Sequence, residues 1–212
     1  MPNWCETNVY ITHNDSDKIK ALYDRIVEWT SKDCYDNDFG TNWLGNVAGN
    51  SGIAKWDEKR NGMLTEDGEF VYCRGSIQYL SCCMKYINHN SNTIEISQED
   101  AWSPILKVWS KVLEKYLPDA SLTFDAVETG SNIYATNNPS IEGNYYIDVW
   151  DVPAEFSDIE PIYVAEEDDV IELCQRILKT DETNINKLLE KITELSWIFI
   201  NRWYHSDVED CD

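Results

Sequence analysis

Lysine and arginine are absent between residues 116 and 175, a window that holds fourteen aspartates and glutamates. Over 212 residues the chain has 39 acidic and only 17 basic side chains, which gives a formal net charge of −22. An acidic surface repels nucleic acid and anionic membranes, and it attracts basic proteins. Direct nucleic-acid binding and membrane attachment are therefore disfavoured, and a basic protein is the expected class of partner.

Other features that the sequence lacks disfavour further classes of protein. No apolar run reaches the ~18 residues that a membrane-spanning helix needs, and the first residues do not resemble a signal peptide. The seven cysteines include no C-x-x-C pair, and the three histidines lie far from paired cysteines. We therefore expect reduced thiols, no metal site, no cofactor and a cytoplasmic location. A glycine-rich phosphate loop and a G-x-S-x-G motif are also missing, so nothing indicates an enzyme.

What the sequence does have is aromatic residues, with nine tryptophans and twelve tyrosines. A disordered acidic tail would lack them, so the charge belongs to a folded body. Alternating and helical apolar spacing predicts strands and helices in mixed order. The predicted strands span 8–12, 76–80, 93–97, 122–126, 132–136, 145–150 and 161–164, with a hairpin turn at Asp67-Gly68. The predicted helices have their apolar positions within 19–27, 105–116, 170–178 and 185–199.

This order predicts an α+β fold with a ferredoxin-like β-α-β-β-α-β core. Residues 33–62 lose the periodicity and contain isolated Trp43 and Trp56, so they form an insertion or long loop after the first helix. A C-terminal helical pair completes the chain. We expect a ferredoxin-like domain over residues 1–152, and an acidic linker with a helical extension over residues 153–212. The helix that ends at Tyr116 is expected to begin with Ser103 as N-cap and Pro104 at its first position.

Two stretches carry a resemblance to a known family. The opening residues 1–11, MPNWCETNVYI, resemble the start of small phage- and plasmid-borne proteins with a YubB-type ferredoxin-like domain. The run Ala101-Trp102-Ser103-Pro104, followed by Leu117-Pro118 and by Glu128-Thr129-Gly130, resembles a second part of that family. The family's Trp-Gly-Thr-Lys-Trp motif is missing, and Arg74-Gly75-Ser76-Ile77-Gln78 stands nearest to it. The resemblance implies a ferredoxin-like fold, an origin in a mobile element and no catalytic residues.

The densest group of charges is Glu166, Glu167, Asp168 and Asp169, directly before a predicted helix. Carboxylates at a helix start are stabilised by the macrodipole, by ~0.3–1 kcal/mol each. One or two acids would satisfy that requirement, whereas four neighbours repel one another. Helix capping, a surface that faces a partner and a divalent-ion site all remain open explanations.

A second acidic run is harder to explain by capping, because it covers a strand end and a proline-containing loop. Acids spaced around apolar anchors can imitate the phosphate track of nucleic acid, which carries about one charge per 1.7 Å of duplex axis. A solvated loop is the alternative. The run consists of the carboxylates Asp148, Asp151, Glu155, Asp158 and Glu160, interleaved with Trp150 and Phe156.

Three functions remain after these arguments. The first is a non-enzymatic protein of a phage or mobile element that binds a basic host protein in the host cytoplasm. Its partner would be a nucleic-acid-binding or nuclease complex, for example of a restriction or CRISPR-type defence system. The second is a carboxylate- or metal-dependent hydrolase, and the third is a structural accessory protein. Near the C-terminus, Trp197 and Trp203 are predicted to pack with Phe199 rather than to bind a ligand.

Overall fold

The computed structural model describes residues 3–35, 39–83 and 92–208. Within these residues the chain is a mixed α+β structure of five α-helices and twelve strands. It divides into two compact units, Met1–Ile133 with Ser206–Asp212, and Tyr134–His205. No helix in the described part of the chain is both long and apolar enough to cross a membrane.

The first unit is built on four antiparallel strands. Strand β1 (Trp4–His13) pairs on one side with β6 (Asn92–Ala101) and on the other with β7 (Ser121–Glu128). Strand β5 (Gly75–Cys83) pairs with the outer side of β6, so the spatial order is β7-β1-β6-β5. Along β1 the apolar and polar residues alternate as the sequence predicts, because successive side chains point to opposite faces. Val9 and Ile11 are fully buried.

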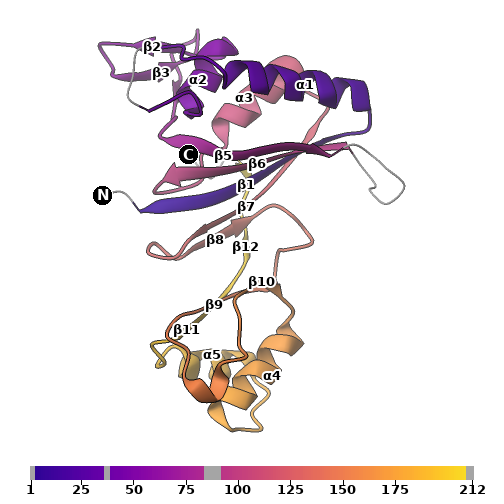
Figure 1. Cartoon of the computed structure of the whole chain (residues 1–212), viewed down its shortest axis with the longest axis vertical. Coiled ribbons are helices and arrows are strands. Elements are labelled where there is room, and N and C mark those ends of the chain that lie inside the picture. The colour runs from indigo at the N-terminus through magenta and orange to yellow at the C-terminus, as the bar shows by residue number, and fades with distance from the viewer. Residues whose placement is uncertain (1–2, 36–38, 84–91, 209–212) are drawn as a thin grey trace. The chain divides into compact units, whose positions relative to one another are not determined.

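Helices α1 (Ser16–Trp29) and α3 (Lys107–Tyr116) connect these strands and lie on the same face of the sheet (Figure 1). Helix α1 begins where the carboxylate of Asp15 accepts hydrogen bonds from the backbone N–H groups of Asp17 and Lys18. Such a cap supplies acceptors for the first-turn N–H groups that have no partner within the helix. The apolar stripe of α1 faces the sheet and is buried at Ile19, Leu22, Ile26 and Trp29.

The start of α3 differs from the sequence prediction. The helix begins at Lys107 after Leu106, with no side-chain cap, instead of at Ser103 and Pro104. The reason is a buried carboxylate outside the helix: Asp100 accepts a hydrogen bond of 2.9 Å from the backbone N–H of Ile105. The segment before the helix is thus a turn, in which Trp102 has a left-handed φ of 77°.

Asp100 is also packed tightly against β5. A Cβ atom built at Gly75 would lie 2.1 Å from the Oδ1 atom of Asp100 and 3.1 Å from the backbone oxygen of Glu99. Only glycine fits there without displacement of the buried carboxylate. The Asp100 side chain itself is fully buried.

We expect Gly75→Ala to lower the free energy of unfolding by ~1–3 kcal/mol, the usual cost of overpacking a core. Urea denaturation measures this loss. In an Asp100→Ala background the same substitution is expected to cost less, because the atom it would strike is gone. An equal cost in both backgrounds would show that the Asp100 contact is not the cause.

Residues 33–62, predicted as an insertion or long loop, form regular elements over part of their length, and residues 36–38 lie outside the described part. The segment contains α2 (Leu44–Asn50), β2 (Lys55–Asp57) and the first residue of β3 (Gly62–Leu64). Strand β3 pairs with β2 and with β4 (Phe70–Val71) to form a small antiparallel sheet. The predicted hairpin at Asp67-Gly68 joins β3 to β4, and Gly68 has a positive φ of 86°. Asp67 does not have a positive φ, so the turn is not the type I′ turn that the Asp-Gly pair predicts.

The second unit has its own sheet and core. Strand β9 (Tyr145–Val149) lies between β10 (Ile162–Ala165) and β11 (Ile198–Arg202), antiparallel to both. A short 3-10 turn, η1 (Ala154–Phe156), precedes β10, and helices α4 (Glu167–Leu178) and α5 (Ile185–Ile192) follow it. Strands β8 (Ile133–Thr136) and β12 (Tyr204–His205) pair in parallel. The core of the unit includes Ile147, Val170, Cys174, Leu188 and Ile200.

Two details of this unit differ from the sequence prediction. The compact division falls after Ile133, whereas the sequence placed a boundary after residue 152. The reason is that β9 pairs with β10 and β11, so the segment before 152 folds with the segment after it. The last predicted helix ends at Ile192, and Phe199 belongs to β11, where it is paired with Asp148. The predicted pair of helices itself is present as α4 and α5.

Candidate functional site

The acidic loop that follows β9 begins with an exposed tryptophan. The backbone N–H of Trp150 donates a 2.9 Å hydrogen bond to the carbonyl oxygen of Trp197, which extends the β9–β11 pairing by one step. Its indole remains 46% exposed. Asp151 then takes a left-handed φ of 48° and turns the chain out of the sheet. Trp150 is therefore held by its backbone while its side chain stays open to a partner.

Phe156 does not share this role, which corrects the prediction that it is a contact residue. It is only 8% exposed and belongs to the core of the second unit. Its ring stacks on Trp197 with a centroid distance of 5.4 Å and an interplanar angle of 17°. Phe156 thus packs the loop against the core, so the acidic residues of the loop belong to an anchored segment.

The five carboxylates of the acidic run 148–160 lie in three different environments. Asp151, Glu155 and Glu160 are exposed, and within the described residues they form no ion pair. Asp158 instead pairs with Arg176 at the end of α4, and the hydrogen bond from this guanidinium lowers the pKa of Asp158. Asp148 is half-buried, and its Oδ1 atom accepts a 2.9 Å hydrogen bond from the N–H of Val149. Asp151, Glu155 and Glu160 are thus the three acids of this segment that are exposed to solvent and form no ion pair within the described residues.

The other acidic group stands at the start of α4, as the sequence predicts. Glu166 is the N-cap residue, and the acidic residues of the first turn are Glu167, Asp168 and Asp169. The helix dipole stabilises carboxylates in this position. The carboxylate of Glu167 also accepts a 3.2 Å hydrogen bond from the hydroxyl of Tyr145. Burial, followed by the charge of Glu167, raises the pKa of that tyrosine.

The structure does not merge the two acidic groups into one cluster. Glu167 and Arg176, the partner of Asp158, lie at opposite ends of α4, ~13 Å apart at a rise of about 1.5 Å per residue. Among the described residues, no group of three or more His, Cys, Asp or Glu side chains is placed to hold a metal ion. The acids form an extended surface rather than a chelating site.

The aromatic residues near the C-terminus pack inside the second unit, as predicted. Trp203 is 1% exposed, and its Nε1 atom donates a 3.0 Å hydrogen bond to the carbonyl oxygen of Tyr163. Trp197 is partly buried under Phe156. Neither side chain is available as an exposed binding surface.

A pair of substitutions separates the buried role of Phe156 from the exposed role of Trp150. We expect Phe156→Ala to lower the free energy of unfolding of the second unit by ~3–4 kcal/mol, because it removes a core ring. Trp150→Ala is expected to change stability by under ~1 kcal/mol, since its backbone hydrogen bond remains. Thermal denaturation of both variants checks this difference, and a larger loss for Trp150→Ala than for Phe156→Ala would contradict it.

In the first unit, the segments that carry the family resemblance meet at one end of the sheet. The backbone N–H of Trp102 donates a 2.9 Å hydrogen bond to the carbonyl oxygen of Asn3. Glu128 is buried and accepts a 2.8 Å hydrogen bond from the N–H of Gly130 and another from that of Ser131. Burial alone would raise the pKa of Glu128, but the hydrogen bonds from Ser131, Gly130 and Asn3 lower it. These contacts hold strand ends together and leave no free acid–base pair.

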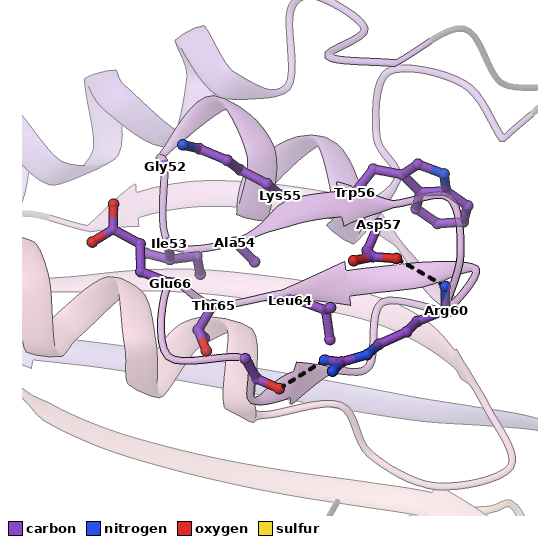
Figure 2. Close-up of a pocket in the computed structure, with 11 residues that line it drawn as sticks. Gly52, Ile53, Ala54, Lys55, Trp56, Asp57, Arg60, Leu64, Thr65 and Glu66 are labelled. Carbon is purple, nitrogen blue, oxygen red and sulfur yellow. Dashed lines mark hydrogen bonds between the residues drawn. The ribbon is translucent and has the colours of Figure 1, made fainter.

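A cavity of about 460 Å³ lies beside the β2–β3 hairpin of the first unit (Figure 2). Its charged side chains have both signs: Lys55, Asp57, Arg60 and Glu66. The carboxylate of Asp57 accepts a 2.9 Å hydrogen bond from the N–H of Arg60, whose guanidinium donates one of 3.4 Å to the carbonyl oxygen of Gly68. Both contacts fix the hairpin, and no nucleophile with an adjacent base lines the cavity.

The sequence does not identify Asp100 as a buried residue, since nothing in the neighbouring sequence distinguishes it from the other acidic residues. It also missed the exposed aromatic residues that gather around the small sheet of the first unit. Comparison with protein-family models, curated proteins and solved structures gave no match. The chain's own geometry therefore carries the functional argument.

Proposed function

We propose that this chain is a non-enzymatic acidic protein of a phage or mobile element that binds a basic host protein. The partner is a nucleic-acid-binding or nuclease complex. The acidic surface around Asp151, Glu155 and Glu160 occupies the groove of the partner that otherwise holds nucleic acid. The observation that carries the proposal is one segment of the chain that holds the exposed Trp150 and the exposed carboxylates of Asp151, Glu155 and Glu160, which form no ion pair within the described residues. An aromatic anchor with charges around it is the usual composition of an interface that binds by both packing and attraction.

The charge balance of the second unit supports this partner class. Residues 134–205 contain fifteen acidic and five basic side chains, a net charge of −10 over 72 residues. Within the described residues, two of the five bases, Arg176 and Lys187, are already paired with acids of the same unit. The excess negative charge attracts a basic surface over about a Debye length, ~8–10 Å at physiological salt.

We further propose that the first unit has a ferredoxin-like core and that the chain comes from a phage or plasmid. The strand order β7-β1-β6-β5, with α1 and α3 as the two crossovers, supports a ferredoxin-like core. The phage or plasmid origin rests on the resemblance at residues 1–11 and around Trp102. The cysteines of the described residues are thiols rather than disulfides, which fits the reducing cytoplasm of a host cell.

Affinity capture tests the proposal most broadly. The tagged protein is incubated with host-cell extract at about 0.05 M and about 0.3 M salt, and the retained proteins are identified by mass spectrometry. We expect a basic nucleic-acid-binding protein that is retained at low salt and weakened at high salt, because screening reduces attraction between exposed charges. Retention of acidic proteins, or recovery of this chain alone, would contradict the proposal.

A further inference from the structure

A second cavity of the first unit has a different character from the acidic surface. It encloses about 380 Å³ beside the small sheet of β2, β3 and β4. Five aromatic side chains line it, and together they are named the aromatic groove: Phe39, Trp43, Trp56, Phe70 and Tyr72. Phe39 and Tyr72 are 66% and 53% exposed, and Trp56 and Phe70 are more than a third exposed. Exposed aromatic surface of this extent marks a binding site more often than a solvated face.

The rings of the groove are ordered by contacts with one another. Phe39 lies against Trp43 at a centroid distance of 5.1 Å, and Trp43 meets Trp56 edge-on at 6.4 Å. Phe70 and Tyr72 form a second edge-to-face pair at 4.9 Å. Figure 2 shows Trp56 at the end of the hairpin away from Glu66. The groove thus presents planar surfaces that are already held in place.

Glycine makes part of this arrangement possible. A Cβ atom at Gly62 would lie 2.1 Å from Cε2 of Phe70, so only glycine lets that ring approach the hairpin backbone. Under the partly buried side of the groove, a Cβ at Gly45 would strike the indole of Trp43 in the same way. These two close approaches show that the ring positions are built into the fold.

The polar groups of the groove are few and selective. Among the residues that the structure describes, Arg74 is the sole charged residue that lines the groove, and no carboxylate lines it. Arg74 is exposed, and its guanidinium forms no ion pair with any described residue. Asn61 also lines the groove, at a left-handed φ of 52°, and its side chain carries an amide donor and acceptor.

We propose that the aromatic groove binds a nucleotide, that is, a planar base with a phosphate group. The base stacks on the rings, the guanidinium of Arg74 binds the phosphate, and the amide of Asn61 is available to the edge of the base. Base–aromatic stacking contributes ~1–3 kcal/mol per base, and arginine binds phosphate in a bidentate manner. A cavity of this size matches those that hold small ligands.

The charge of the chain restricts the ligand to a short one. At −22 the protein repels a polyanion along its whole length, whereas a single nucleotide brings one phosphate to the one guanidinium. The groove residues belong to the first unit, so this proposal does not depend on the function proposed above.

The test uses the four ribonucleoside 5′-monophosphates, with adenosine as the phosphate-free comparison, in isothermal titration calorimetry with the full chain. We expect saturable binding of at least one monophosphate, and at least about tenfold weaker binding of adenosine than of adenosine monophosphate. Arg74→Gln is expected to remove the preference for the phosphate, and Tyr72→Ala to weaken both ligands. Arg25→Gln removes an exposed guanidinium of the same unit that does not line the groove, and it is expected to change neither.

Several results would overturn this inference. One is no saturable binding of any of the four monophosphates. Another is equal affinity for adenosine and its monophosphate, which would remove Arg74 from the site. A ten-nucleotide single strand that binds more tightly than every mononucleotide would show that the rings are a platform for a polymer. An equal loss in Arg25→Gln and Arg74→Gln would place the phosphate elsewhere.

Discussion

When the pH is raised from 5.5 to 8, the free energy of unfolding of the Asp100→Asn variant is expected to increase by about 2 kcal/mol relative to that of the wild-type protein. Asp100 is fully buried in the first unit. Burial raises its pKa to about 7, and the hydrogen bonds from Ile105, Gln98 and Thr7 offset only part of that rise. The amide of asparagine can accept the same hydrogen bond from Ile105 without a charge.

The sign follows from proton binding. The pKa of Asp100 is 3.8 in the reference state and about 7 in the folded protein, so the folded state binds more protons between these values. Wild-type stability therefore falls as the pH rises from about 4 to about 7, and this contribution is constant above that window. Asparagine does not titrate, so its advantage grows over the same range.

Urea denaturation of both proteins at pH 5.5 and pH 8 measures this change. The repulsion from the net charge of −22 is nearly the same in both proteins and largely cancels in the difference. A stability difference that is the same at both pH values would show that Asp100 is ionised throughout. If the variant instead loses stability relative to the wild-type protein between pH 5.5 and pH 8, burial does not raise the pKa of Asp100.

The second large effect concerns partner binding. Replacement of Asp151, Glu155 and Glu160 by Asn, Gln and Gln is expected to weaken binding of the basic partner by ~10- to 100-fold. Three charge contacts at ~0.5–1 kcal/mol each give this range. The association rate is expected to fall, and the salt dependence to become shallower, because long-range attraction is lost. Asp158 is left unchanged, since its ion pair with Arg176 ties the loop to α4.

The chain offers a matched control for this variant in the same unit. Asp181, Glu190 and Glu194 are exposed and lie around α5, away from the loop in sequence. Their replacement by Asn, Gln and Gln changes the net charge by the same amount. Surface plasmon resonance with the captured partner is expected to show a small effect in this control. Equal losses in both triple variants would mean that total charge, not the loop, determines binding.

The sequence predicts the regular parts of the fold because their periodicity reports burial directly. The alternation around Val9 and the apolar stripe from Ile19 place β1 and α1 correctly, and Asp67-Gly68 marks the β3–β4 hairpin. The start of α3 is missed because its decisive contact comes from Asp100, outside the helix. Capping preferences depend only on residues near the helix start, such as Ser103 and Pro104, and do not include a buried carboxylate on β6.

The candidate sites are predicted less well, for two physical reasons. Phe156 and Trp150 are both aromatic residues in an acidic loop, and only the tertiary stack on Trp197 makes one buried and the other exposed. Phe199 has helical spacing with Leu195, but pairing with β9 makes it part of a strand. The aromatic groove joins residues more than thirty positions apart, from Phe39 to Tyr72. The isolated tryptophans at 43 and 56 were its one signal.

The central claim, that the acidic surface takes the place of nucleic acid on a basic partner, is tested most directly by competition. Fluorescence anisotropy follows a labelled DNA duplex bound to the captured partner during titration with this protein. We predict that the wild-type chain displaces the duplex and that the variant with Asp151, Glu155 and Glu160 neutralised displaces it at least about tenfold less effectively. A duplex that stays bound at saturating wild-type protein, in a ternary complex, would contradict the claim.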